Sequence, residues 1–242
     1  MKKRILIATA TYNEVLNIER LVKKIFKLNN QFNLFIVDDN SPDGTYLILR
    51  KLSKEFKKLK ILIRNKKKGL NTAHVMIFNE AIKNKYDYLI TMDADFSHDP
   101  NDIKKIIHYL DSFDFVIGSR YIKGGKSLMS FSRYIISKYG NRFIKFFLNT
   151  KLSENTTSFR GFNLNRLRKL KVDLNHINSN GYSFFMEVIF YLIQKKCTIK
   201  EFPIVFKDRK HGISKISKVE IFRTLKNLFR LKFNSLFKRN LY

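Results

Sequence analysis

Short apolar runs alternate with longer amphipathic stretches along the first half of the chain. Runs rich in β-branched and aromatic residues predict strands at 4–9, 33–39, 60–64, 88–92 and 114–119. Between them, apolar residues spaced three or four positions apart predict helices at 15–26, 45–56, 72–84 and 101–110. Strands and helices that alternate in this way are typical of parallel α/β proteins. We therefore expect an α/β fold with a mainly parallel sheet flanked by helices.

The second half of the chain has a different pattern. Residues 128–149 form an aromatic and basic helical stretch, followed by a predicted helix at 182–195 and a predicted strand at 198–206. A last predicted helix, from Ser217 onward, places five apolar residues on one face: Phe222, Leu225, Phe229, Phe233 and Leu236. Basic residues flank the apolar faces of the 128–149 helix and of this last helix, which favours two helices that lie in a membrane interface. The alternative is that these apolar faces pack on the core.

Length and composition limit the classes of protein that fit this pattern. The 242 residues, 44% of them hydrophobic, suffice for one main domain at 1–216 and a basic amphipathic helix at 217–242. Cys197 is the single cysteine, so no disulfide framework is available and a reducing cytoplasm fits. The apolar run near the N-terminus is too short for a signal peptide, and no stretch is long and apolar enough to span a membrane.

The formal net charge is +28, with 48 Lys and Arg against 20 Asp and Glu. Such a charge favours polyanions, which include nucleic acid, phosphate-bearing substrates and anionic lipid. No recognised nucleic-acid-binding module is present, and acidic motifs occupy the ligand edge of the predicted sheet. We therefore expect no specific nucleic acid partner, and we interpret the charge as attraction to phosphate groups and to an anionic membrane surface.

Carboxylates follow two of the predicted strands, at the edge where parallel sheets bind ligands. Asp93 and Asp95 come directly after a buried strand, and carboxylates at this spacing can share one hard divalent cation. The alternative is a polar turn at a strand end. Asp39 ends the second predicted strand, where it can accept hydrogen bonds from a nucleobase or ribose, or else cap the next helix. The segment "TYNE" (11–14) also has two interpretations: it forms an aromatic wall beside a base, or it is the start of a helix.

Two phosphate-binding motifs are excluded. The "GGKS" segment at 124–127 lacks the earlier glycine of a P-loop, because Arg120 occupies that position. No G-x-G-x-x-G motif follows the first predicted strand, so the sequence lacks the main evidence for a dinucleotide-dependent oxidoreductase.

Eight motifs follow one another along the chain: "TYNE", "VDDNSPDGT", "GLNTAH", "MDADFSHDP", "GSRYIKGG", "SFRGF", "GYSFFMEV" and "FPIVFKDRKHGISKIS". Together, over residues 4–220, they resemble the dolichol-phosphate mannosyltransferase branch of the inverting, family 2 glycosyltransferases. The resemblance implies a glycosyltransferase A fold with a mixed, mainly parallel sheet, so that 1–216 is a catalytic domain. It also implies a nucleotide-sugar donor, usually GDP-mannose, a polyprenyl monophosphate acceptor and, at the aspartate pair, Mg²⁺ or Mn²⁺. The alternatives are a glucosyltransferase or another transferase that uses a UDP-sugar, and a catalytically inactive scaffold, which the intact aspartate pair disfavours.

The resemblance assigns three sets of residues. The nucleoside set is Ala10, Thr11, Tyr12, Glu14, Val37 and Asp39, with Ala94 beside it. The metal and diphosphate set is Asp93, Asp95 and Ser97. The set that binds the acceptor phosphate is Arg120, Arg133, Arg209 and Lys215. The chain departs from the family pattern at Ala10, Asn71 and Glu154, where proline, glycine and aspartate are usual, whereas His98 and Asp99 are interpreted as loop structure.

Phosphate chemistry and the resemblance together predict a direct mechanism. A phosphate monoester has a second pKa near 6, so at neutral pH most of the acceptor is a dianion that can attack the anomeric carbon without a strong general base. A metal on the departing diphosphate and arginines on the acceptor phosphate would neutralise charge. Attack in line would invert the anomeric centre and give a β-linked product from an α-linked donor. Because the acceptor lipid stays in the bilayer, we expect a peripheral protein on the cytoplasmic face of a membrane, and whether a separate membrane protein anchors it stays open.

Overall fold

The structure is a computed structural model of the whole chain, and it describes residues 3–177, 179–208 and 218–236. Within these ranges the central sheet has seven strands in the order β3-β2-β1-β4-β7-β5-β8. The strands are β1 (Ile5–Thr11), β2 (Asn33–Asp38), β3 (Leu59–Ile63), β4 (Tyr88–Thr91), β5 (Phe115–Ser119), β7 (Arg160–Asn163) and β8 (Ile199–Pro203). Neighbouring strands are parallel except at β7, which is antiparallel to both β4 and β5. The prediction of a mixed, mainly parallel sheet is confirmed.

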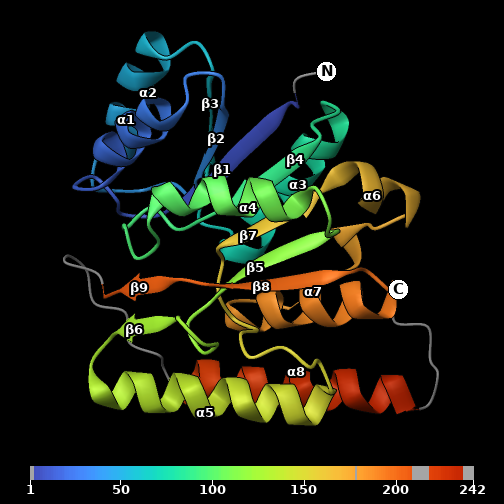
Figure 1. Cartoon of the computed structure of the whole chain (residues 1–242). Helices are drawn as coiled ribbons and strands as arrows, with labels where there is room; N and C mark the ends of the chain where they lie inside the picture. Colours follow the sequence, from blue (N-terminus) through green and yellow to red (C-terminus); the bar gives the residue numbers. More distant parts are fainter. Residues whose placement is uncertain (1–2, 178, 209–217, 237–242) are drawn as a thin grey trace.

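Helices cover both faces of the sheet (Figure 1). One face packs against α1 (Ile18–Leu28), α2 (Thr45–Glu55) and α4 (Ile103–Leu110), which is preceded by the 3₁₀ turn Pro100–Asp102. The other packs against α3 (Leu70–Lys83), α6 (Leu164–Lys169) and α7 (Tyr182–Gln194), with the 3₁₀ turn Leu174–His176 between the last two. Because successive strand residues point to opposite faces, Ile7 belongs to the first core while Leu6 and Ala8 belong to the second.

The predicted strand at 198–206 is in fact two strands. Strand β8 ends at Pro203, and β9 (Val205–Lys207) pairs with β6 (Lys126–Leu128) in a separate two-stranded parallel sheet. The chain turns from one sheet to the other at Ile204, whose backbone N–H still donates to the last residue of β5, Ser119, at 3.1 Å. Strand β6 was not predicted either, because its short segment carries no alternating apolar pattern.

The local pattern also does not predict β7, which lies between β4 and β5. Its Gly161 allows α4 to cross the sheet closely, since a Cβ there would lie 2.3 Å from Ile106 Cγ2. Its Arg160 is 1% exposed. The strand brings the preceding segment, residues 154–159, to the end of β4, where Thr91 Oγ1 donates to Ser158 O at 2.7 Å.

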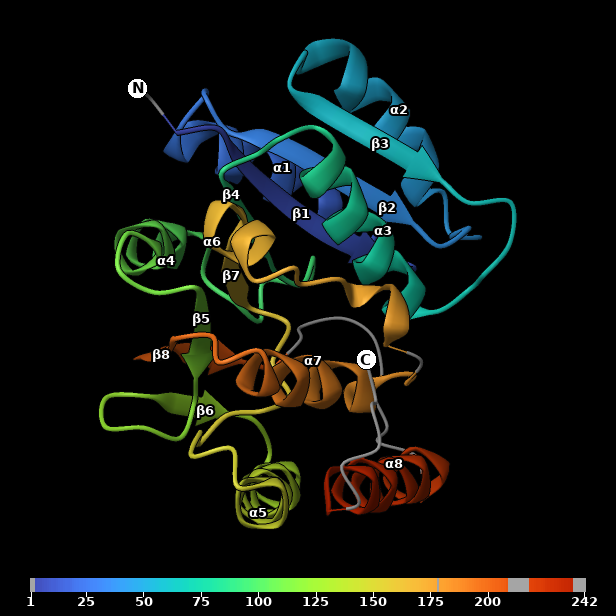
Figure 2. The same ribbon diagram turned by 90° about the vertical axis from the view of Figure 1, so that its right-hand side faces the viewer.

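A layer of two further helices lies at the bottom of Figures 1 and 2, where α5 (Phe131–Leu148) and α8 (Lys218–Leu236) lie side by side and pack on α7. Their shared apolar cluster contains Ile144, Leu148, Met186, Phe190, Leu228 and Leu231. Glu187 of α7 is fully buried and accepts a hydrogen bond from Arg230 Nη2 of α8 at 2.7 Å. Part of each predicted amphipathic helix therefore packs on the protein, as the alternative expected.

Other apolar side chains of the two helices stay exposed. They are Phe131, Ile136, Tyr139, Phe143 and Phe146 on α5, and Phe222, Leu225, Phe229 and Phe233 on α8. Phe147 joins the two rows, because its ring stacks on Phe143 and meets the Phe229 ring edge-on at 5.1 Å. We call this exposed set the aromatic face. Within the described ranges, no helix combines the length and the apolarity that crossing a bilayer would require.

Candidate active site

The loops that follow β1, β2, β4 and β5 meet at the carboxyl edge of the sheet. Strands β2 and β3 extend the sheet on one side of β1, and the chain then returns to place β4 on the other side. Such a reversal of strand order creates a crevice at the carboxyl ends of the strands. Three residues of these loops, Asn13, Asn40 and Phe96, have left-handed φ angles of 61°, 61° and 60°. Asparagine tolerates this conformation, but phenylalanine rarely adopts it, and such strain concentrates at functional sites.

Asp93 and Asp95 lie in the loop after β4, as the sequence predicts. The Asp93 side chain is 35% exposed, and its Oδ1 accepts a hydrogen bond from Ser158 Oγ at 2.6 Å. Asp95 is buried, and its Oδ1 accepts from the backbone N–H of Ser97 at 3.0 Å. The Ser97 hydroxyl is buried and has no hydrogen-bond partner in the described part of the chain. Two carboxylates and an unused hydroxyl are an oxygen donor set that suits a hard cation such as Mg²⁺ or Mn²⁺.

Tyr12 and Asp39 contribute an aromatic ring and a carboxylate to the predicted nucleoside set. Tyr12 is 39% exposed, and Lys67 Nζ lies 3.6 Å from the centre of its ring. The buried Asp39 carboxylate accepts from Arg64 Nη1 at 3.0 Å and from the backbone N–H groups of residues 68 and 69 at 2.7 and 2.8 Å. These bonds fix the loop that leads into α3 beside the Tyr12 ring.

The alternative in which Asp39 caps the next helix is wrong. Its partners lie before α3, and the first turn of α2 is instead held by Asp43, whose Oδ1 accepts from the backbone N–H of Thr45 at 3.0 Å. The rest of the nucleoside set comprises the half-buried Ala10 and Glu14 and the buried Thr11, Val37 and Ala94. The Val37 side chain packs in the apolar core on the α3 side of the sheet.

Arg120 follows β5 and forms a buried ion pair with Glu154. Its Nε donates to Glu154 Oε2 at 2.7 Å and its Nη2 to Oε1 at 2.8 Å, and the two side chains are 8% and 0% exposed. Nη2 also donates to Thr156 Oγ1 at 3.1 Å. Burial alone would raise the pKa of Glu154, but Arg120 and the bonds from Thr156 outweigh it and hold that pKa below its ordinary value. Glu154 is therefore ionised at neutral pH and holds Arg120 as a charged pair.

Arg133, near the start of α5, forms a more exposed pair. Its Nη1 lies 2.6 and 2.8 Å from the two carboxylate oxygens of Asp208, and the side chains are 28% and 32% exposed. Arg209 and Lys215, the other two predicted phosphate-binding residues, lie outside the described residues. The fold thus brings Arg133 beside the residue that immediately precedes Arg209.

The sequence did not indicate how segment 154–158 contributes to the site. Glu154 holds Arg120, and Ser158 holds Asp93. The sequence marks Glu154 only as a departure from the family pattern. Its position, and that of Ser158, depend on β7, which local patterning does not predict.

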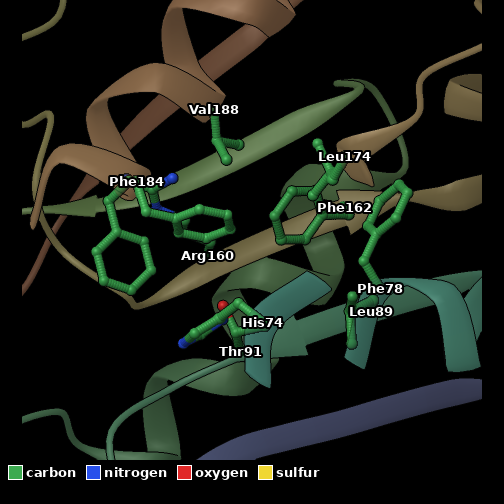
Figure 3. Close-up of a pocket in the computed structure, with 10 residues that line it drawn as sticks. His74, Phe78, Leu89, Thr91, Arg160, Phe162, Leu174, Phe184 and Val188 are labelled. Atoms are coloured by element: carbon green, nitrogen blue, oxygen red, sulfur yellow. The ribbon is translucent and has the colours of Figure 1, made fainter. Parts of the chain in front are cut away.

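A small cavity lies behind this segment, between α3, α7 and the sheet (Figure 3). Its volume is about 10 Å³, room for about one water molecule. Arg160 lines it, and Arg160 Nη1 has no partner among the described residues. Figure 3 shows His74 of α3 on the opposite wall, where burial lowers its pKa to about 3. The cavity is too small for a nucleotide sugar.

Comparison with known sequences identifies similar proteins over most of the chain. The family model for glycosyl transferase family 2 matches residues 6–170. The chain is 31% identical over 218 residues to the polyprenol monophosphomannose synthase of Mycolicibacterium smegmatis, covering 89% of this chain and 82% of that protein. It is 33% identical over 215 residues to the undecaprenyl-phosphate mannosyltransferase of Micrococcus luteus, covering 88% of each. It is 35% identical over 225 residues to the dolichol-phosphate mannosyltransferase of Pyrococcus furiosus, covering 91% of this chain and 61% of that protein.

Solved structures share the fold. The glucosyl-3-phosphoglycerate synthase of Mycobacterium tuberculosis, in complex with Mn²⁺, UDP and glucosyl-3-phosphoglycerate, matches with a TM-score of 0.66 at 11% identity, over 96% of this chain and 80% of that one. A mannosyltransferase of Pyrobaculum calidifontis, in complex with GDP-Man and Mn²⁺, matches with a TM-score of 0.61 at 14% identity, over 99% of this chain and 66% of that one. At these identities the likeness extends to the fold alone.

Proposed function

The chain belongs to glycosyl transferase family 2 and is a glycosyltransferase, and we propose that it transfers mannose from GDP-mannose to a polyprenyl monophosphate. The observation that carries this proposal is the identity of 31%, 33% and 35% to three proteins named for mannose transfer to polyprenol-type lipids. The intact aspartate pair at the carboxyl edge of the sheet supports an active enzyme.

A divalent cation is part of the proposal. Asp93, Asp95 and Ser97 would hold it, and the unused Ser97 hydroxyl supports this assignment. The described residues contain no group of three or more His, Cys, Asp and Glu side chains that could hold a metal ion. The shell would therefore be completed by diphosphate oxygens of the donor and by water, which both Mg²⁺ and Mn²⁺ accept. When bound, the cation would supply positive charge to the departing diphosphate.

The acceptor phosphate is proposed to lie on the side of Arg120 and Arg133. Arginine suits this role because its planar, paired donors match phosphate oxygens. The dianionic phosphate needs alignment with the anomeric carbon more than it needs a base, since most of it is already deprotonated at neutral pH. Attack opposite the diphosphate would invert the anomeric centre.

The aromatic face supports a membrane-bound acceptor. Phe146 and Phe222 are 84% and 71% exposed, and basic residues of the same helices, among them Arg142, Lys145 and Arg223, are also exposed. Exposed aromatic side chains flanked by basic residues are typical of helices that lie in the surface of an anionic membrane. We therefore propose peripheral attachment to the cytoplasmic face of a membrane, with the polyprenyl tail in the bilayer and its phosphate at the sheet edge.

A donor panel tests this function. Purified protein, Mg²⁺ or Mn²⁺ and polyprenyl phosphate are incubated with radiolabelled GDP-mannose, UDP-glucose or UDP-N-acetylglucosamine, and label in the lipid phase is measured. We expect label from GDP-mannose alone. Label only from a UDP-sugar would replace the donor, and no label from any donor would contradict the acceptor class.

A further inference from the structure

His98 is a buried ring at the centre of the site, although the sequence indicates only loop structure for it. Its side chain is 1% exposed. The ring stacks on Phe159, with centroids 5.0 Å apart and planes at 17°, and it meets the Phe206 ring edge-on at 5.5 Å. Packing on two aromatic rings fixes the orientation of the imidazole and therefore the directions of both its nitrogen atoms.

The hydrogen bonds of His98 define which nitrogen carries the proton. The backbone N–H of Asp93 lies 3.4 Å from His98 Nδ1, and because an amide N–H can only donate, Nδ1 is the acceptor. Nε2 therefore carries the proton and donates to Thr157 Oγ1 at 3.1 Å.

The segment that receives this bond also holds the Asp93 side chain. Ser158, next to Thr157, donates to Asp93 Oδ1 at 2.6 Å. Asp93 is thus fixed at its backbone by His98 and at its carboxylate by Ser158, and both contacts lead to residues 157–158. Arg160 Nε secures this segment in turn by donating to Thr157 O at 2.6 Å.

We propose that His98 is a positioning residue that, with Thr157 as its acceptor, sets the orientation of Asp93 for binding of the divalent cation. The inference rests on the metal-dependent transfer proposed above. Groups that hydrogen-bond to metal ligands tune affinity, and their removal typically weakens metal binding by about 10- to 100-fold. His98 accepts from the backbone N–H of Asp93, and its Nδ1 also lies 3.8 Å from Asp93 Oδ2, so it would act on the ligand without itself binding the cation.

The same segment extends this positioning toward the acceptor side. Glu154, three residues before Thr157, holds Arg120, and Arg120 Cζ lies 5.1 Å from the centre of the Phe206 ring. Phe206 therefore touches both His98 and Arg120. His98 consequently connects Asp93, a proposed metal ligand, with the residues that surround Arg120, which we place beside the acceptor phosphate.

Binding of Mn²⁺ in the presence of GDP, measured by electron paramagnetic resonance of free Mn²⁺, tests this role without requiring turnover. His98→Phe keeps the aromatic packing and removes both hydrogen bonds, so we expect Mn²⁺ binding to weaken about tenfold or more. His98→Asn supplies an acceptor oxygen for the Asp93 N–H and should restore part of the affinity. Thr157→Val keeps the histidine but removes its acceptor, and should give a smaller loss. His176→Asn, at an exposed histidine, is the matched control and should bind as the unaltered protein does.

Three outcomes are distinguishable. Graded weakening, largest in His98→Phe and smaller in His98→Asn and Thr157→Val, supports the inference. Folded His98→Phe with unchanged Mn²⁺ affinity, or equal weakening in His98→Phe and His98→Asn, overturns it. Failure of the unaltered protein to bind Mn²⁺ with GDP would instead overturn the proposed metal-dependent function.

Discussion

The carboxyl edge of the sheet buries charged side chains, whereas the aromatic face of α5 and α8 exposes apolar ones. Asp95, Arg120 and Glu154 are 8%, 9% and 0% exposed, but Phe146 and Phe222 are 84% and 71% exposed. Both regions invert the usual distribution of polar and apolar residues. Buried charges persist only when they are paired or bound, and a large exposed apolar patch marks contact with another apolar surface.

The two regions therefore differ in what a substitution should change. At the edge, the charged groups are hydrogen-bonded to neighbouring residues, so replacing one should alter the chemistry or the stability of the fold. On the aromatic face, the rings have one side in solvent, so replacing one should alter location while the fold is kept.

The largest effect is expected for Asp95→Ala. Removing one of the two proposed metal carboxylates should lower the rate of sugar transfer on the order of 10³-fold, because charge on the departing diphosphate is then poorly neutralised. The measurement is the initial rate with saturating GDP-mannose and Mn²⁺. Asp99→Ala is the matched control, since that carboxylate caps the turn at Pro100–Asp102 and should be dispensable for turnover. Normal turnover by Asp95→Ala would contradict the metal assignment.

Glu154→Gln should have the next largest effect, on stability. It leaves Arg120 buried without its carboxylate, which typically costs about 3–5 kcal/mol in the free energy of unfolding. Urea unfolding measures this loss. Asp208→Asn, in the more exposed pair with Arg133, is the comparison and should cost about 0–1 kcal/mol. Equal losses in the two variants would contradict the contrast between the buried and exposed pairs.

The effect of Glu154 should also depend on pH. Its pKa is lowered in the folded protein, so its contribution to stability is present above its ordinary pKa of 4.5 and is lost as pH falls through the lower folded value. The difference in unfolding free energy between the unaltered protein and Glu154→Gln should therefore shrink in acid. A difference that grows as pH falls would contradict this sign.

A smaller effect is expected on the aromatic face. Phe146→Ser and Phe222→Ser should each weaken binding to anionic phospholipid vesicles about tenfold or more, since burying one phenylalanine contributes roughly 1.5–3 kcal/mol. Unfolding free energies should stay within about 0.5 kcal/mol, as is usual at the surface. Co-sedimentation with vesicles measures the binding. Leu47→Ser, at an equally apolar position that is 58% exposed on α2, should bind vesicles normally. Unchanged binding by both phenylalanine variants would exclude this face as the membrane contact.

Arg133→Lys should have the smallest effect. Lysine keeps the charge but loses the paired donors, so the KM for polyprenyl phosphate should rise about fivefold, the equivalent of roughly 1 kcal/mol for one hydrogen bond. Stability should hardly change, because the pair with Asp208 is partly exposed. Arg142→Lys on the same helix is the control. A rise in the KM for GDP-mannose instead would place Arg133 on the donor side.

The first half of the fold was predictable because its information is local. Each of the strands β1 to β5 is a short apolar run followed by an amphipathic helix or a turn, and periodicity located all five. Strand β7 was not predictable in the same way. Its sequence, from Arg160 through Gly161 to Asn163, is not an apolar run, and it pairs with β4 and β5 through contacts that are distant in sequence.

The candidate site, too, was predictable only where the information is local. Asp93, Asp95 and Arg120 follow predicted strands, so motif and position located them together. The residues that bind Asp93 and Arg120, namely Ser158 and Glu154, do not follow predicted strands. They reach the site only because β7 lies beside β4. The role of Asp39 in fixing the loop before α3 could likewise not be predicted. Its partners Arg64 and Gly69 are distant in sequence and hydrogen-bond to it only in the folded chain.

The anomeric configuration of the lipid product shows whether the transfer is a single displacement. In that mechanism, which we propose, an acceptor phosphate near Arg120 and Arg133 attacks opposite a diphosphate held at Asp93 and Asp95. Product formed from GDP-mannose and polyprenyl phosphate in vesicles would be isolated and its anomeric coupling measured by NMR. We predict a β-linked mannosyl phosphate. An α-linked product would contradict it.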